Sequence, residues 1–232
     1  MVLPCDLVQP VQVLQVVAQR RLAELGHTVL LGARDPQRGQ AAAGRLGVRF
    51  VPIDVTDDDS VKRAVADVEA HEGRLDTLIN NAGIIGPRAT AGELTGDDAL
   101  LVFDTNVVSI VRVTNAFLPL LERSDAPAVI NVSSGMGSFA LTHDPSRVES
   151  TIASPLYTAS KSAVTMMTAQ YAKAIPEVRF NAADPGYTAT DLNGHTGHQT
   201  VSEGTDAIVA LSTEDSSAGT GRFMGRVGPV AW

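Results

Sequence analysis

The stretch Leu75-Asp76-Thr77-Leu78-Ile79-Asn80-Asn81-Ala82-Gly83 shows the pattern that decides the fold of this 232-residue chain. A short apolar run, suited to a buried parallel strand, stops at polar residues and a glycine, as a strand does where it enters a turn. Similar runs occur at residues 28–33, 48–53, 128–132 and 178–183, and a last one lies near 221–226. The sequence therefore predicts a series of buried strands.

Helical patterns separate these runs. We expect helices near residues 15–25, 36–46, 57–71, 97–121, 155–174 and 203–212. Strands and helices that alternate with short connections form a parallel sheet with helices on both faces. We therefore predict an α/β fold, a Rossmann-like doubly wound parallel sheet, built as a single domain over residues 1–232.

The bulk composition limits the classes of function. Eighteen basic and 26 acidic residues give a formal charge of −8, which argues against nucleic acid or an anionic membrane as the main partner. The apolar runs fall short of the roughly 18 residues that span a bilayer, and the N-terminus lacks a secretory signal pattern. The single cysteine, Cys5, fits a reducing compartment. We expect a cytoplasmic protein whose main partner is neither nucleic acid nor a membrane.

Polar residues gather where the predicted strands end. They are Arg34, Asp54, the turn at residues 80–83, Ser134 and the turn at Pro185 and Gly186. Ligands of doubly wound sheets bind at the carboxyl ends of the strands, so these positions are the candidate site.

Tyr157 and Lys161 lie four residues apart, on one face of the predicted helix. A nearby ammonium group favours the phenolate and is expected to lower the pKa of the tyrosine from about 10. Such a pair can give a proton to a carbonyl oxygen or take one from an alcohol. Taken alone, the pair also fits two exposed polar residues on a helix surface.

Several motifs occur together and in order: Asn80-Asn81-Ala82-Gly83, Asn106, Ser134, Tyr157-x-x-x-Lys161 and Pro185-Gly186. In this order and context they resemble the short-chain dehydrogenases/reductases. Residues 32–41 also look like the corresponding segment of the NADPH-dependent carbonyl reductases in that family. The resemblance covers about residues 20–232.

The resemblance implies four catalytic residues. Tyr157 would be the general acid/base, and Lys161 would lower the pKa of Tyr157 and bond the nicotinamide ribose. Ser134 would hydrogen-bond the substrate carbonyl. Its neighbour Ser133 competes for this role, but the family motif places the catalytic serine three residues after the asparagine of Asn-Val-Ser-Ser. Asn106 would anchor a water that links Lys161 to solvent; alternatively it is a polar residue that bends its helix.

The resemblance also implies a set of cofactor-binding residues: Arg34, Asp54, Val55, Asn81, Ala82, Gly83, Tyr157, Lys161, Pro185, Gly186 and Thr188. Within this set Asp54 and Val55 would border the adenine ring. Pro185, Gly186 and Thr188 would flank the nicotinamide carboxamide. A guanidinium such as that of Arg34 suits the 2′-phosphate on the adenosine ribose of NADP(H). A carboxylate at this position would instead bond the 2′-hydroxyl of NAD(H). NADP(H) is therefore favoured over NAD(H). The alternative is that Arg34 ends its strand in solvent, with Asp35 as its ion-pair partner.

One departure from the family concerns the phosphates. Its glycine-rich first turn should fall at residues 8–15, where this chain has Val8-Gln9-Pro10-Val11-Gln12-Val13-Leu14-Gln15. Side chains at three glycine positions, Gln9, Val13 and Gln15, are expected to crowd the pyrophosphate. Residues 1–19 could reflect a local reading-frame error or a lineage that lost the turn. A rival interpretation is therefore a non-catalytic or cofactor-impaired binding or scaffold protein on the same fold.

A second departure is the spacing of 23 residues between Ser134 and Tyr157, which makes residues 136–154 an insertion beside the substrate pocket. It is either a substrate-shaping lid or a plain surface loop. Residues 187–203 are expected to form a mobile substrate flap. His195 and His198 lie in this flap, but no carboxylate or cysteine cluster supports a metal site.

The sequence favours an NADP(H)-dependent oxidoreductase that acts on a carbonyl or alcohol substrate and needs no metal. A nucleotide-sugar epimerase or dehydratase shares the Tyr-x-x-x-Lys motif, but only 46 residues follow Gly186, too few for the C-terminal substrate domain that is usual there. The family is mostly dimeric or tetrameric, and the apolar end at residues 227–232 could serve such an interface.

Overall fold

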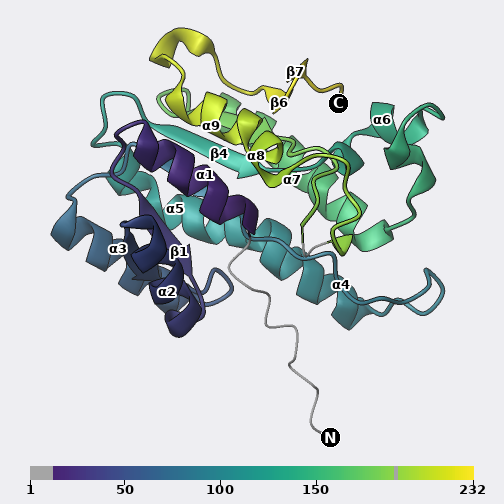
Figure 1. The fold of residues 1–232 in the computed structure, drawn as a ribbon, viewed down its shortest axis with the longest axis horizontal. Helices are drawn as coiled ribbons and strands as arrows, with labels where there is room; N and C mark the ends of the chain where they lie inside the picture. The colour runs from purple at the N-terminus through teal and green to yellow at the C-terminus, as the bar shows by residue number, and fades with distance from the viewer. Residues whose placement is uncertain (1–12, 191–192) are drawn as a thin grey trace, which may run out of the picture.

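The computed structural model describes residues 13–190 and 193–232 (Figure 1). The predictions for residues 1–12, most of the expected glycine-rich turn among them, lie outside this part. The first half of the described chain contains α1 (Val13–Glu24), β1 (Leu30–Ala33), α2 (Pro36–Leu46), β2 (Arg49–Pro52), α3 (Asp58–His71) and β3 (Thr77–Asn80).

The second half continues the alternation. It contains α4 (Gly96–Phe103), a π-helical turn (Asp104–Val108), α5 (Ser109–Leu121), β4 (Ala128–Val132), α6 (Phe139–His143), α7 (Pro155–Ala174), β5 (Arg179–Ala183), α8 (Val201–Gly204), α9 (Asp206–Thr213), β6 (Phe223–Gly225) and β7 (Gly228–Pro229). Each predicted strand and helix is present, with ends shifted by a few residues.

The strands pair mostly in parallel, which confirms the α/β class. β1 pairs with β2, and β3, β4, β5 and β6 pair in that order, each parallel to the next. β7 adds an antiparallel edge to β6. The residues aligned across the centre are Ile79, Ile130 and Asn181.

The sheet differs from the prediction in one respect. Among the described residues, β1–β2 and β3–β7 form two separate sheets, and no described strand joins β1 to β3. A doubly wound sheet of order 3-2-1-4-5-6 has its first strand at that place. That strand would precede α1, where the described part of the chain begins.

Local sequence explains where the helices begin. Asp35 accepts a hydrogen bond from the Arg38 N–H group, and Pro36 provides the preset φ of the first turn of α2. Asp57 caps α3 in the same way. Thr95 and Asp98 form a reciprocal capping box at α4.

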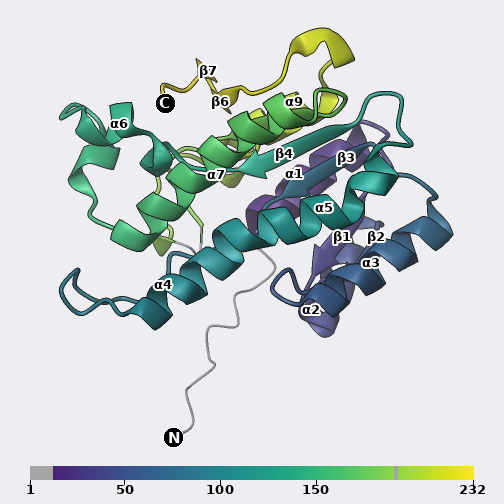
Figure 2. The same ribbon diagram turned by 180° about the vertical axis from the view of Figure 1, so that it is seen from behind.

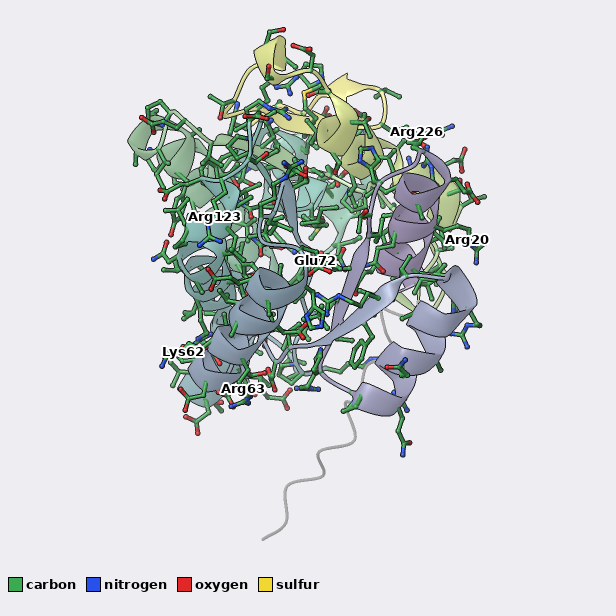
Figure 3. The ribbon with its side chains drawn as sticks, turned by 90° about the vertical axis from the view of Figure 1, so that its left-hand side faces the viewer. Arg20, Lys62, Arg63, Glu72, Arg123 and Arg226 are labelled. Carbon is green, nitrogen blue, oxygen red and sulfur yellow. The ribbon has the colours of Figure 1, made fainter. Side chains whose placement is uncertain are left out.

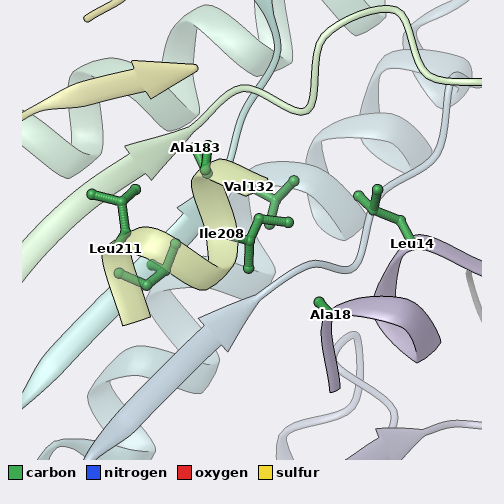
Figure 4. Packing of buried hydrophobic residues seen from close by; sticks show 8 residues of the cluster. Leu14, Ala18, Val132, Ala183, Ile208 and Leu211 are labelled. Carbon is green, nitrogen blue, oxygen red and sulfur yellow. The ribbon is translucent and has the colours of Figure 1, made fainter. Parts of the chain in front are cut away.

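Helices cover both faces of the β3–β7 sheet. Figure 1 shows α1, α8 and α9 in front of the sheet, and Figure 2 shows α5 and α7 on the opposite side. On the first face, Leu14 and Ala18 of α1 share a buried cluster with Ile208 and Leu211 of α9 and with Val132 (Figure 4). All five residues of β4 are buried between the two layers, so β4 is the centre of the core.

The helical run Gly96–Leu121 is 26 residues long and, by length and composition alone, apolar enough to cross a membrane. This corrects the expectation that no apolar segment reaches such a length. Its buried side chains, however, include Val113, Phe117 and Leu120, which pack on α3 and β2. Such packing is that of a core helix.

Charged side chains cover the outer surface. Figure 3 shows Lys62 and Arg63 on α3, and Arg123 after α5, on the outside of the molecule. Lys62 lies 3.0 Å from Asp59, with both side chains about three-quarters exposed. Pairs as exposed as this one add little to stability.

Candidate functional site

The candidate site forms where the turns after β3, β4 and β5 meet α7. Gly137, in the turn after β4, lies directly against α7: a Cβ atom there would come within 2.5 Å of the Lys161 carbonyl carbon. Gly83, in the turn after β3, lies at ordinary contact distance, since its Cβ would be 3.4 Å from Lys161 Nζ. The turn after β4 therefore needs a glycine to approach the lysine that the sequence predicts to be catalytic, and the turn after β3 lies beside the same lysine.

The structure separates the two candidate serines. Ser133 is buried, and its hydroxyl bonds the Lys161 carbonyl oxygen at 3.0 Å and the Thr165 hydroxyl at 2.7 Å. Ser134 is partly exposed, and its hydroxyl hydrogen-bonds toward the Tyr157 hydroxyl, which acts to lower the pKa of the tyrosine. Of the two serines, Ser134 is therefore the one whose hydroxyl faces Tyr157, and its assignment as the catalytic serine stays a prediction.

Lys161 is almost fully buried, with 5% of its surface exposed. Its ammonium group donates to the carbonyl oxygen of Val132 at 2.8 Å and lies 5.7 Å from the centre of the Tyr157 ring. Burial lowers the pKa of Lys161 to about 8, and the negative charge of Asp184 acts in the opposite direction. The lysine can therefore release or take up a proton near neutral pH.

Tyr157 departs from the expectation of a lowered pKa. Burial raises the pKa of Tyr157 to about 12; Ser134 opposes this shift and the charge of Asp184 adds to it. The lowering of this pKa that we expected from Lys161 is not seen; the ammonium group donates to the Val132 carbonyl. At neutral pH Tyr157 is a proton donor, held in its neutral form by its surroundings.

Asn106 lies in the π-helical turn between α4 and α5 and is 1% exposed. Its side-chain oxygen accepts from the Ile84 N–H group at 2.8 Å, and its amide donates to the Ile84 carbonyl and to the Ser160 hydroxyl, both at 2.9 Å. These contacts tie the segment after β3 to the helix that carries Tyr157 and Lys161. A π-helical turn inside an α-helix often marks a functional site.

Two of the predicted nicotinamide neighbours have clear local roles. Gly186 has a φ of +68°, which favours glycine, and its N–H group donates to Asp184 Oδ1 at 2.9 Å. The Thr188 hydroxyl donates to the Pro185 carbonyl at 2.8 Å and is buried. Asp184 was not among the predicted site residues, although its position as a polar residue at the end of a buried strand was a signal for it.

The predicted adenine-side residues lie at the ends of β1 and β2. Asp54 accepts from the N–H and hydroxyl groups of Thr56 at 3.0 and 2.7 Å. Val55 packs into the core. Arg34 is exposed, and within residues 13–190 and 193–232 it has no ion-pair partner, because Asp35 caps α2 and pairs with Arg38 at 3.7 Å. The alternative pairing of Arg34 with Asp35 is therefore wrong.

The described residues fit the two halves of a dinucleotide differently. Gly83, predicted to line the adenosine side of the cofactor, lies near Lys161: a Cβ atom on it would be 3.4 Å from Lys161 Nζ, an ordinary contact distance. On the phosphate side, Gln15 belongs to α1, and its amide donates to the carbonyl of Gly32 at 2.9 Å. No glycine occurs in α1, so the described start of this helix supplies no glycine-rich turn.

The two predicted loops contain more structure than expected. Residues 136–154 contain α6 and a 3₁₀ turn (Val148–Thr151), and Glu149 of this turn is buried against Gly135. In the predicted flap, Ala189 and Gln199 are joined by a backbone hydrogen bond of 2.9 Å, and the rings of Tyr187 and His198 pack at 5.8 Å. Within the described residues no group of three His, Cys, Asp or Glu could hold a metal ion.

Comparisons with known proteins agree with this arrangement. The family model for short chain dehydrogenase matches residues 16–200. A short-chain dehydrogenase/reductase of Aspergillus fumigatus is 36% identical over 197 residues, covering 73% of this chain and 71% of the relative. A short-chain dehydrogenase of Penicillium roqueforti is 33% identical over 213 residues, covering 85% and 83%.

A solved structure is also close to this one. The NADPH-bound carbonyl reductase from chicken fatty liver superposes with a TM-score of 0.84 at 28% identity, over 97% of this chain and 96% of that one. The motifs, the mostly parallel sheet and these relatives lead to one conclusion. The chain belongs to the short-chain dehydrogenase/reductase family of oxidoreductases.

Proposed function

We propose that this protein transfers a hydride between NADP(H) and a carbonyl or alcohol substrate, with Tyr157 as the general acid/base. The observation that carries the proposal is the convergence of Ser134 and Lys161 on Tyr157 at the carboxyl ends of β4 and β5. Consumption of NADPH that depends on an added ketone, aldehyde or quinone tests it.

In this proposal the cofactor supplies the hydride, and the chain supplies orientation and the proton. The Ser134 hydroxyl bonds the substrate oxygen and holds it beside the Tyr157 hydroxyl. Tyr157, neutral at physiological pH because its pKa is raised to about 12, donates its proton to the oxygen as negative charge develops there. Lys161, with a pKa of about 8, is a proton source close to the tyrosine ring.

We assign the cofactor preference to Arg34. Its exposed guanidinium lies directly after β1, and α2 begins two residues later at Pro36. A guanidinium there suits the 2′-phosphate that distinguishes NADPH from NADH. The similar carbonyl reductase structure contains bound NADPH.

The second candidate function is a non-catalytic or cofactor-impaired protein on the same fold. It is favoured by Gln15, which occupies a glycine position of the family's phosphate turn and whose amide bonds β1. A thermal shift with NADPH separates the two candidates. A ligand at a hundred times its dissociation constant stabilises by about 2.7 kcal/mol, so a clear rise in melting temperature is expected for the enzyme. The absence of any shift at millimolar NADPH would favour the second candidate.

We also propose a homodimer or homotetramer in the cytoplasm. Large apolar side chains on the helical run Gly96–Leu121 are exposed, with Leu100 at 70%, Leu101 at 49% and Val108 at 44%. The C-terminal segment offers a second exposed apolar surface, with Val227 at 100% and Trp232 at 48%, and its end is held in place because Ala231 and Trp232 accept hydrogen bonds from Ser138 and Ala140. Light scattering of the purified protein measures the oligomeric state.

A further inference from the structure

In the segment after β5, one side chain fills a backbone acceptor and a backbone donor together. Asn193 Nδ2 donates to the Thr188 carbonyl oxygen at 2.8 Å, and Asn193 Oδ1 accepts from the Thr190 N–H group at 3.2 Å. A primary carboxamide combines a carbonyl oxygen with an NH₂ group, so a single such group can make both hydrogen bonds. The backbone at Thr188 and Thr190 thus binds a primary carboxamide, and in this structure the carboxamide belongs to the same chain.

These backbone groups lie on the side of the sheet that carries the candidate serine. The turn that leads to Thr188 begins at Asp184, whose Oδ1 atom accepts from the Gly186 N–H group at 2.9 Å. The Oδ2 atom of the same carboxyl group lies 3.2 Å from the position of a Cβ atom on Gly135, the residue after Ser134. The Thr188 N–H group donates to the Gly186 carbonyl at 2.9 Å. The turn therefore places the carboxamide partners beside the candidate site.

The backbone next to Asn193 has an uncommon conformation. Gly194 and His195 have φ angles of +64° and +62°. Glycine adopts such angles readily, whereas His195 is the one non-glycine residue with a positive φ within residues 13–190 and 193–232. Such conformations gather at ligand sites and persist where contacts hold them. Here the His195 N–H group donates to the Thr190 carbonyl at 2.9 Å, and the Thr196 hydroxyl donates to the Asn193 carbonyl at 2.8 Å.

We propose that Asn193 is an internal competitor of the cofactor: its side chain makes the two hydrogen bonds that the nicotinamide carboxamide would make with Thr188 and Thr190. The family resemblance implies only that Thr188 flanks the nicotinamide. Asparagine and nicotinamide carry the same carboxamide group, so each can replace the other at this pair. A ligand that needs an already filled site binds more weakly, in proportion to the fraction of molecules in which the site is open. The inference rests on the proposed function, because it requires a nicotinamide cofactor.

The test compares two ligands by isothermal titration calorimetry. NADPH carries the nicotinamide, whereas adenosine 2′,5′-bisphosphate has only the adenosine half of the cofactor. Asn193→Ala removes the competing carboxamide and should bind NADPH roughly 10-fold more tightly than the unsubstituted protein does, as expected for one or two lost competing hydrogen bonds. The affinity of the variant for the bisphosphate should be unchanged, since that ligand has no carboxamide.

The matched control is Thr196→Val, in the same segment. It removes the hydroxyl that bonds the Asn193 carbonyl oxygen at 2.8 Å and the Tyr187 hydroxyl at 2.6 Å, but it leaves the Asn193 carboxamide present. NADPH affinity should therefore not rise in the control. An equal gain in the control, or an equal gain for both ligands in Asn193→Ala, would overturn the inference. An unchanged or weaker NADPH affinity in Asn193→Ala would overturn it as well.

If Asn193→Ala does not fold, NMR of the unsubstituted protein still decides. The side-chain amide signal of Asn193 should move when NADPH binds and stay in place when the bisphosphate binds; a signal that NADPH leaves unmoved contradicts the proposal. Tighter NADPH binding by Asn193→Ala without carbonyl-dependent NADPH consumption would overturn the proposed function and leave the competition intact. If NADPH binds neither the unsubstituted protein nor Asn193→Ala, both the proposed function and the competition are overturned.

Discussion

Tyr157 and Lys161 lie one helical turn apart, yet burial changes their pKa values in opposite directions, to about 12 and about 8. Each shift disfavours the charged form of its group, since a charge loses hydration when it is buried. The buried lysine charge therefore lowers the stability of the fold, and in the proposed function it is needed for catalysis. This conflict between stability and function can be measured at the single residue.

Lys161→Met should raise the free energy of unfolding at pH 7 by on the order of 1–2 kcal/mol, because it removes a buried charge. The sign of the pH dependence follows from the lowered pKa. Between about pH 8 and 10.5 the folded protein has released the Lys161 proton while the unfolded chain still holds it, so the unsubstituted protein gains stability as pH rises. In Lys161→Met that gain should be missing.

The matched control for this change is Lys173→Met, at the exposed end of the same helix, which should change stability by less than about 0.5 kcal/mol. Denaturant unfolding at several pH values measures all three proteins. A Lys161→Met variant that is less stable than the unsubstituted protein at pH 7 would show that burial of the ammonium group costs less than its bond to Val132 provides.

Arg34→Asp should weaken NADPH relative to NADH, because a carboxylate repels the 2′-phosphate and accepts from a 2′-hydroxyl. The loss of a charge-assisted contact of this kind corresponds to about 1.5–3 kcal/mol, or roughly 10-fold to 100-fold in relative affinity. Arg45→Asp, at the far end of α2, is the control and should keep the preference. Titration of each cofactor by fluorescence gives the ratio. If the ratio of NADPH to NADH affinity is unchanged in Arg34→Asp, Arg34 does not contact the 2′-phosphate and is only a solvent-exposed residue at the end of β1.

At this scale the sequence predicted which side chains meet, but not how their surroundings act on them. Ser134 was separated from Ser133 by the motif alone, and the contacts of both agree. The pKa of Tyr157 was predicted in the wrong direction, because burial and the charge of Asp184 depend on three-dimensional neighbours. The approach of Glu149 and Asp184 to Gly135 could not be predicted either, because Glu149 lies in a 3₁₀ turn of the inserted segment, whose fold no short pattern predicts.

Among the elements, the helical run from α4 to α5 is interrupted by the π-helical turn that carries Asn106. The side chain of Asn106 makes three hydrogen bonds to two segments, Ile84 and Ser160, and so connects β3 to α7. The interpretation of Asn106 as a water anchor stays a prediction. Its contacts show that it also has a structural task.

Asn106→Ala should destabilise the protein by about 2–3 kcal/mol, because buried partners at Ile84 and Ser160 lose their hydrogen bonds. Asn115→Ala is the matched control on α5: Asn115 is exposed and accepts only from the Tyr171 hydroxyl at 3.1 Å, so its loss should cost under about 1 kcal/mol. Equal losses in the two variants, measured by denaturant unfolding, would contradict this account of the π-helical turn.

The elements themselves could be predicted because they are long or strongly patterned. Strand 128–132 and helix 155–174 have the predicted bounds. The short α6 and the 3₁₀ turn at residues 148–151 could not be predicted, since five or fewer residues carry no clear period. The same holds for the π-helical turn, which depends on contacts with Ile84 rather than on its own sequence.

At the scale of the whole molecule, α1 supplies side-chain contacts at the edge of β1. Gln15 and Gln19 donate side-chain hydrogen bonds to the carbonyl oxygens of Gly32 and Leu30, at 2.9 and 3.1 Å. Leu14 and Ala18, on the same helix, pack into the core on the β3–β7 side. The helix thus bridges the two sheets with side chains.

The structure brings the predicted catalytic residues together, whereas the described start of α1 supplies no glycine-rich turn for the phosphates. Tyr157 and Lys161 lie on α7, and Ser134 lies in the turn after β4, the strand whose five residues are all buried. The cofactor phosphates of the family would approach the side where Gln15 contacts β1. Activity of this chain therefore depends on whether NADPH can bind beside Tyr157 when Gln15 occupies a glycine position of the phosphate turn.

The most direct test of the central claim is NADPH consumption by the purified chain against a panel of ketones, aldehydes and quinones, compared with Tyr157→Phe. We expect carbonyl-dependent consumption by the unsubstituted protein. In Tyr157→Phe we expect it to fall by a factor of about 100 or more, with the NADPH thermal shift retained, since the phenylalanine ring keeps the packing but has no proton to give. Equal rates in the two proteins, or no carbonyl-dependent consumption by either, would contradict the assignment of Tyr157 as the general acid/base.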